Sequence, residues 1–186
     1  MEISILNAIQ SLRTPVLDAV MVFFTFLGNH GWFWIALTAI LIAVPKTRIW
    51  GLTMGTALLM GQLIGVCVIK PLVARPRPFN SPDAMVTASQ LLVAELKDYS
   101  FPSGHTQASF AAAAVLFRMN RKAGAAAFVL AALIAFSRMY LYVHYPTDVL
   151  AGALLGLLWA FCAVKWFKPL YEKAAAAITG RKHSAQ

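Results

Sequence analysis

A succession of apolar runs of nearly membrane-spanning length constrains the fold of this chain more than any other feature. A helix that crosses a bilayer needs about 20 consecutive apolar residues, and three runs approach that length, at residues 49–69, 123–137 and 149–166. Two shorter runs precede them, at residues 16–28 and 32–44. Hydrophobic residues make up 60% of the chain and charged residues only 12%, which is not the composition of a soluble domain. The sequence therefore predicts an integral membrane protein.

These runs, together with a helix expected to begin at Ser103, predict an all-α, polytopic membrane helical bundle of about six transmembrane helices. No internal repeat or linker divides the chain, so residues 1–186 are expected to form one integral-membrane domain. Six crossings would place both termini on the same side of the membrane. The weakly amphipathic residues 2–12 are expected to lie in the membrane interface on that side. The first residues lack the features of a removable signal peptide.

The distribution of Lys and Arg predicts which side that is. Of the 16 Lys and Arg residues, six crossings place eleven on the side of the termini and the other five opposite them. By the positive-inside rule the termini are cytoplasmic. The net charge of +9 therefore indicates membrane topology, and no nucleic-acid partner is expected. The five opposite residues are Lys70, Arg75, Arg77, Lys97 and Arg138.

Three short polar segments, residues 70–78, 102–105 and 137–148, interrupt the apolar sequence. In the six-helix arrangement all three lie on the extracytoplasmic side, so their side chains are expected to meet there. They carry cations, imidazoles, a carboxylate and a helix start, which are the groups that phosphate chemistry uses. The candidate site residues are Lys70, Arg77, Ser103, Gly104, His105, Arg138, His144 and Asp148.

The first two segments look suited to binding an anion. Arg77 offers a planar fork for phosphate oxygens and Lys70 a point charge, although two such residues alone more often reach toward lipid headgroups. Ser103, Gly104 and His105 open an apolar helix, where free backbone amides and the helix dipole favour a phosphate. His105 would then be placed to donate a proton to a leaving oxygen. The alternative is that Ser103 only caps the helix and His105 faces water.

The third segment supplies a cation and a paired histidine. Arg138 near the end of an apolar run costs about 2.5–3.5 kcal/mol if it is held deep in the bilayer, so it needs an anionic partner or must reach the interface. His144 and Asp148 are four residues apart, close enough for the carboxylate to fix one ring nitrogen and leave the other free to attack phosphorus. An isolated pair of this spacing is more often a salt bridge at a helix start.

Taken together, the three segments resemble the motifs of a known family. K-P-L-V-A-R-P-R-P fits K-x6-R-P, F-P-S-G-H fits P-S-G-H, and S-R-M-Y-L-Y-V-H-Y-P-T-D fits S-R-x5-H-x3-D. In this order they resemble the type 2 phosphatidic acid phosphatases (PAP2), membrane enzymes that hydrolyse lipid phosphates and diphosphates without a metal. The resemblance covers residues 70–148. Two other functions stay open for such a helical bundle. One is a transporter, which would move a solute without releasing phosphate, and the other is a metal enzyme.

The resemblance assigns a role to each candidate residue and implies that no cofactor is needed. His144 would be the nucleophile that forms a phosphohistidine, Asp148 would orient it, and His105 would act as acid and then as base. The remaining residues would bind the phosphate, and three nearby cations would repel a divalent metal ion held by the two histidines and Asp148. The phosphate-binding residues are Lys70, Arg77, Ser103, Gly104 and Arg138.

The resemblance also suggests the substrate and the location. Small single-domain members of the family look like bacterial undecaprenyl diphosphate phosphatases of cell-wall lipid recycling, so a membrane lipid that carries a phosphate or diphosphate is expected as the partner in the bilayer. Phosphatidylglycerophosphate, phosphatidate and lipid A phosphate stay open as alternatives. The expected location is the cell membrane, with several passes and the active site on the extracytoplasmic face. The loop of residues 80–100 is placed to cover that site.

Overall fold

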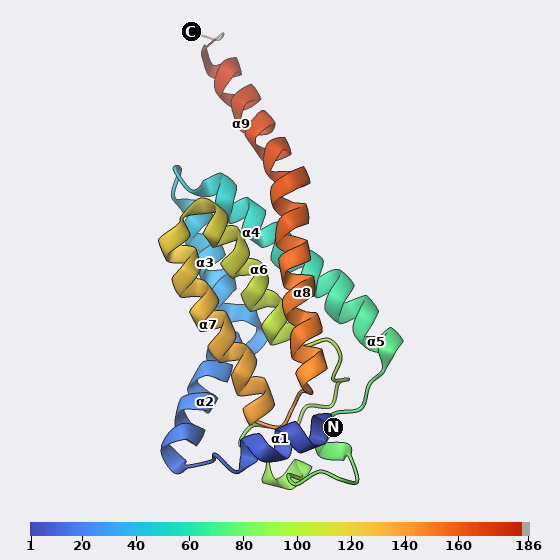
Figure 1. Ribbon diagram of the computed structural model, residues 1–186. Coiled ribbons are helices and arrows are strands. Elements are labelled where there is room, and N and C mark those ends of the chain that lie inside the picture. Colours follow the sequence, from blue (N-terminus) through green and yellow to red (C-terminus); the bar gives the residue numbers. More distant parts are fainter. Residues whose placement is uncertain (184–186) are drawn as a thin grey trace.

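The computed structural model describes residues 1–183, and in that range the chain forms helices, turns and one long loop without any strand. The predicted all-α membrane bundle is confirmed. π-Helical segments at Gly61–Ile69 and Ala163–Phe167 join α4 to α5 and α8 to α9, so each pair forms one long rod (Figure 1). The α-helices are α1 (Glu2–Gln10), α2 (Pro15–Gly28), α3 (Trp32–Ala43), α4 (Arg48–Met60), α5 (Lys70–Val73), α6 (Gly104–Met119), α7 (Arg121–Tyr140), α8 (Pro146–Cys162) and α9 (Lys168–His183).

The two short apolar runs near the N-terminus form one bent span and not two crossings. Helices α2 and α3 continue in the same general direction across the break at Asn29–Gly31 (Figure 1), and Pro15–Ala43 is one candidate membrane span. His30 and Gly31 have φ angles of 51° and 68°, which end α2 without reversing the chain. The other candidate spans are Arg48–Asn80, Arg121–Tyr140 and Pro146–Ile178. With α6, the described residues run along the bundle five times, one fewer than the about six crossings expected from the sequence.

An odd number of passes separates the ends of the described chain. The N-terminus lies at the end of the bundle where the polar segments gather, and α9 leaves from the opposite end (Figure 1). Helix α1 is bound there: Gln10 Nε2 donates to the Tyr140 carbonyl at 2.7 Å, and the Tyr142 hydroxyl donates to Asn7 Oδ1 at 2.5 Å. The sequence had placed residues 2–12 at the other interface. The cause of this correction is the missing crossing at Asn29–Gly31.

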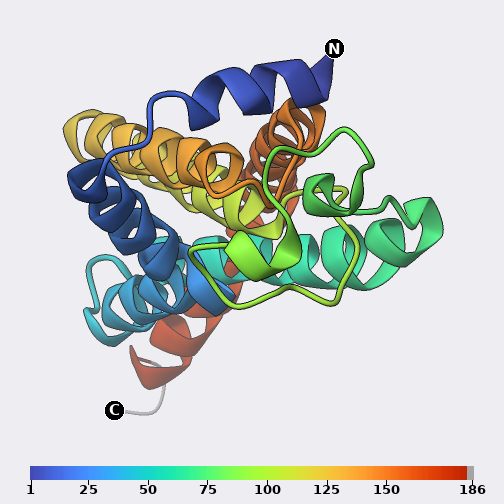
Figure 2. The same ribbon diagram turned by 90° about the horizontal axis from the view of Figure 1, so that it is seen from below.

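Helix α1 and the long loop of residues 81–103 form a layer across this end of the bundle (Figure 2). The buried Leu6 of α1 belongs to the same apolar cluster as Val86 of the loop and residues of the turn between α7 and α8. A compact apolar cluster therefore holds the polar segments in place from outside the membrane helices. Its buried members are Leu6, Met21, Phe79, Val86, Tyr140, Leu141, Tyr142 and Val143.

Helix α6 lies in the middle of the bundle, packed between α7 and α8. Gly152 and Gly156 of α8 face it, and a Cβ at Gly152 would lie 2.7 Å from the carbonyl oxygen of Ser103. Small residues four apart allow two membrane helices to approach closely. The close approach fixes the start of α6 beside the start of α8, which brings two of the three polar segments together.

The charge asymmetry survives the change in topology. Placing residues 2–13 at the end with the polar segments moves only Arg13, so the division of the 16 Lys and Arg residues becomes ten to six. Five of those six residues, Arg13 included, make polar contacts within the protein. Arg13 pairs with Asp18 at 3.1 Å. The positive-inside rule still favours a cytoplasmic α9.

Single cysteines test the five-pass arrangement. In a Cys67→Ala/Cys162→Ala background, cysteines at Ser4 and Ser81 should react with an impermeant thiol reagent from the same side of the membrane, and a cysteine at Lys173 only from the other side. Labelling of intact cells and of inverted vesicles measures this. If position 4 were labelled together with position 173, the chain would make an even number of passes.

Candidate active site

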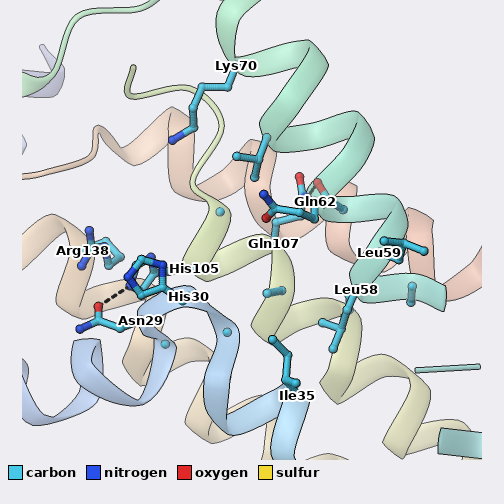
Figure 3. Close-up of a pocket in the computed structure, with 18 of the residues that line it drawn as sticks. Asn29, His30, Ile35, Leu58, Leu59, Gln62, Lys70, His105, Gln107 and Arg138 are labelled. Carbon is cyan, nitrogen blue, oxygen red and sulfur yellow. Dashed lines mark hydrogen bonds between the residues drawn. The ribbon is translucent and has the colours of Figure 1, made fainter. Parts of the chain in front are cut away.

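The three polar segments meet around one cavity of about 760 Å³ (Figure 3). The chain brings them there by three helix ends: α5 delivers the first, α6 begins with the second, and the turn between α7 and α8 carries the third. Six of the eight predicted site residues line the cavity, and the other two, Ser103 and Asp148, lie behind its wall. The cavity-lining members are Lys70, Arg77, Gly104, His105, Arg138 and His144, joined by Asp98.

Lys70 and Arg77 are buried cations that share one carboxylate. Their exposed fractions are 7% and 3%. Lys70 Nζ lies 2.7 Å from Asp98 Oδ2, and Arg77 Nη2 lies 2.6 Å from Asp98 Oδ1. Burial alone raises the pKa of Asp98, but the hydrogen bond from Lys70 and the charge of Arg77 outweigh it and hold the pKa at about 2. Asp98 is therefore an anion bound between the two predicted phosphate ligands.

Arg138 is a buried cation with an unused donor. It lies in the last turn of α7, is 2% exposed and donates from Nη1 to the Thr25 hydroxyl. Its Nε has no hydrogen-bond partner among the residues that the structure describes. A buried donor without an acceptor is costly, and here it belongs to a side chain that lines the cavity. This geometry indicates a site that an anion would complete.

The start of α6 presents Gly104 and His105 to the cavity but turns Ser103 away from it. The Ser103 amide donates to the Asp148 carbonyl at 3.1 Å, and its hydroxyl accepts from the Thr106 hydroxyl at 2.9 Å. Ser103 therefore acts as the helix cap, the alternative that its sequence left open, and its amide is not available to a phosphate. The amides that follow it at a helix start have no intrahelical acceptor.

His144 lies between Asp148 and the cavity, as its spacing from Asp148 predicted. Its Nδ1 is 3.5 Å from Asp148 Oδ2, and its Nε2 is 3.5 Å from Arg77 Nη1 on the cavity side. Burial lowers the pKa of His144 to about 3; the Asp148 contact opposes this shift, whereas the charges of Arg138, Arg77 and Lys70 add to it. The ring is therefore neutral at pH 7, with Nε2 able to present a lone pair.

Asp148 is held by residues that the sequence did not single out. Its Oδ1 accepts from Arg75 Nη1 at 2.7 Å, and its Oδ2 accepts from the Ser100 hydroxyl and from the Tyr145 amide. Arg75 also pairs with Glu2 at 2.5 Å, so α1 is tied to the carboxylate that contacts His144. Arg75 lies two residues before Arg77 in the same motif, and this position could have marked it as a site residue. A loop serine such as Ser100 gives no such signal.

The break between α2 and α3 also reaches the cavity. Asn29 Oδ1 lies 3.0 Å from His105 Nε2 (Figure 3), and His30 also lines the cavity. A Cβ at Gly28 would lie 2.6 Å from His105 Cδ2, so only glycine permits this approach. Residues 28–31 therefore line the cavity, because the break they form lies within a span.

The described residues offer no cluster that could hold a metal ion. No group of three or more His, Cys, Asp or Glu side chains with that geometry lies within residues 1–183. His105 Nε2 is directed at Asn29, and Asp148 is occupied by Arg75 and Ser100. The positive charge around the cavity is supplied by side chains.

Away from the cations the cavity becomes apolar. It continues between α3, α4 and α6 past Gln62 and Gln107, and Figure 3 shows Lys70 and Arg138 at one end and aliphatic side chains at the other. The shape suits a molecule with an anionic head and an apolar chain. The lining residues of the apolar part include Ile35, Leu58, Leu59, Val66, Ala108 and Ala111.

Comparisons with known proteins agree with this geometry. Residues 32–172 match the PAP2 superfamily. The chain is 34% identical to the undecaprenyl-diphosphatase of Sulfolobus acidocaldarius over 154 residues, which cover 82% of this chain and 72% of that one. The structure of Aquifex aeolicus LpxE is similar with a TM-score of 0.75 and 27% identity, covering 89% of this chain and 95% of that one. A PAP2-type phosphatidylglycerolphosphate phosphatase from Bacillus subtilis has a TM-score of 0.70 and 30% identity, with coverage of 92% and 85%.

Proposed function

Because this chain belongs to the PAP2 superfamily and is a membrane lipid phosphatase, we propose that it hydrolyses undecaprenyl diphosphate to undecaprenyl phosphate and phosphate through a phosphohistidine. The observation that carries this proposal is the cavity with a cationic head and an apolar continuation. A diphosphate at the head would meet Lys70, Arg77 and Arg138, and an isoprenoid chain would lie along the aliphatic part between α3, α4 and α6.

In the first step the terminal phosphorus would be held opposite His144. Nε2 attacks, a bond forms between nitrogen and phosphorus, and the bond to the leaving oxygen breaks. The proton on Nδ1 faces Asp148, which stabilises the charge that the ring gains. His105 donates a proton to the leaving oxygen. Asn29 Oδ1 can only accept, so Nε2 keeps its proton, and the proton that is donated must come from Nδ1 of a doubly protonated ring.

In the second step water would release the phosphate. His105, now without its proton, removes a proton from the water, the oxygen bonds to phosphorus, and the bond to His144 breaks. Phosphate leaves and both histidines return to their starting forms. The same residue therefore serves as acid and as base.

Charge stabilisation in both steps falls to the buried cations. The transition state spreads negative charge over three oxygens of the transferred group, and fixed donors in a site without bulk water stabilise it best. Arg77 is fixed by the Val143 carbonyl at 2.7 Å, and the free Nε of Arg138 would gain an acceptor. Three cations already provide what a metal ion would supply, so we propose a metal-independent reaction.

The substrate choice and the side of the membrane rest on separate observations. The relative from Sulfolobus acidocaldarius is named an undecaprenyl-diphosphatase, which favours a polyprenyl diphosphate. The similar structure from Bacillus subtilis is a phosphatidylglycerolphosphate phosphatase, so that lipid is the second candidate. The ten-to-six division of Lys and Arg supports an extracytoplasmic site.

The nucleophile is tested by trapping. His144→Ala should lose turnover completely, because no other imidazole among the described residues lies between Arg77 and Asp148, while binding of the lipid should survive. Acid quench of the wild-type protein during turnover of ³²P-labelled undecaprenyl diphosphate should give an acid-labile, base-stable label on His144. Label on a serine or an aspartate would contradict the mechanism.

The role of His105 is tested by the leaving group. A lipid monophosphate expels an alkoxide, which needs a proton, whereas a diphosphate expels a phosphate whose second pKa is about 6. In His105→Ala, phosphoenzyme formation should fall about 10²- to 10⁴-fold with the monophosphate and much less with the diphosphate. Hydrolysis should be slow in both cases, so phosphoenzyme should accumulate only with the diphosphate. Rapid quench measures both steps. Equal losses in the first step would mean that His105 only binds phosphate.

A further inference from the structure

Asp98 occupies the position where the phosphate of a substrate would bind. One carboxylate oxygen lies 2.7 Å from Lys70 Nζ and the other lies 2.6 Å from Arg77 Nη2. A phosphate would be held in the same way, with two of its oxygens each bound to a different cation. The two cations are buried, but the Asp98 side chain is 52% exposed, so it reaches them from the solvent side.

The backbone around Asp98 is fixed, which limits how the carboxylate can leave. Arg77 Nε donates to the Asp98 carbonyl at 2.8 Å, Lys70 Nζ donates to the Tyr99 carbonyl at 2.9 Å, and the Ser100 amide donates to the Arg75 carbonyl at 2.8 Å. None of these three bonds uses the carboxylate. Rotation of one half-exposed side chain would therefore free Lys70 and Arg77 while the loop keeps its position.

Resting on the proposed function, we propose that Asp98 is a specificity-determining residue that competes with phosphate for Lys70 and Arg77 and so excludes free inorganic phosphate from the site. A carboxylate on the chain is present at high effective concentration. An incoming anion must displace it or bind beside a like charge. A lipid substrate gains further contacts along the apolar part of the cavity, and inorganic phosphate gains none.

This competition would also help the product to leave. After hydrolysis of the phosphohistidine, the product at the cations is inorganic phosphate without a chain to hold it. Return of the Asp98 carboxylate would replace it on Lys70 and Arg77. Asp98 therefore lowers product inhibition, and the chain-bearing substrate, which must displace the same carboxylate, offsets that cost with its contacts along the apolar part of the cavity.

The proposal is tested by phosphate binding to the purified full-length protein in detergent. Asp98→Asn removes the charge and keeps the size, and Asp98→Ser removes both the charge and the reach to the cations. Equilibrium dialysis with ³²P-labelled inorganic phosphate should show a dissociation constant that is about tenfold lower in both variants than in the wild type. The inhibition constant of phosphate against lipid hydrolysis should fall in parallel.

Asp83→Asn is the matched control, because Asp83 is an exposed acidic residue of the same loop without an ion pair among the described residues. It should leave phosphate binding unchanged. Thermal unfolding shows whether each variant is folded. Unchanged or weaker phosphate binding in folded Asp98→Asn or Asp98→Ser would overturn the proposal.

The dialysis needs no turnover, so it separates this proposal from the proposed function. If none of the lipids tested is hydrolysed but both Asp98 variants bind phosphate more tightly, the competition stands and the assigned reaction fails. If lipid is hydrolysed and phosphate binding does not respond to either variant, the role of Asp98 fails alone.

Discussion

The burial of Lys70, Arg77 and Arg138 around one cavity is the constraint on which the rest of the structure depends. Buried cations are unfavourable unless an anion or several acceptors compensate them. The chain supplies the Asp98 carboxylate and a few carbonyl and hydroxyl oxygens, and the Nε of Arg138 still lacks a partner among the described residues. The cations are thus only partly compensated, and a bound anion would supply the acceptor that Arg138 Nε lacks.

Other parts of the protein hold these cations and the two histidines in their relative positions. Gly152 lets α8 approach the start of α6, and Gly28 lets the end of α2 approach the ring of His105. Helix α1 reaches the site through Glu2, Arg75 and Asp148, which contacts His144. The histidine that we propose as nucleophile is thus positioned by contacts that begin at the second residue of the chain.

Sequence reasoning succeeded where spacing or composition determines geometry. The four-residue separation of His144 and Asp148 at a helix start places their side chains together in almost any context, and long apolar runs predict spans. It failed at residues 29–31, because two short runs joined by a polar turn look alike whether the chain reverses or only bends. Asp98 was not predicted as a site residue because its partners are 28 and 21 residues away. A loop carries no periodic pattern from which such contacts can be predicted.

The most direct test of the account is a structure of the protein with orthovanadate, which imitates the transition state of phosphoryl transfer. We expect vanadium bonded to His144 Nε2, vanadate oxygens within hydrogen-bond distance of Lys70, Arg77 and the Nε of Arg138, and the Asp98 carboxylate turned away from both of its cations. Vanadate bound elsewhere, or bound in the cavity with its metal away from His144, would contradict the central claim that this cavity is a phosphoryl-transfer site.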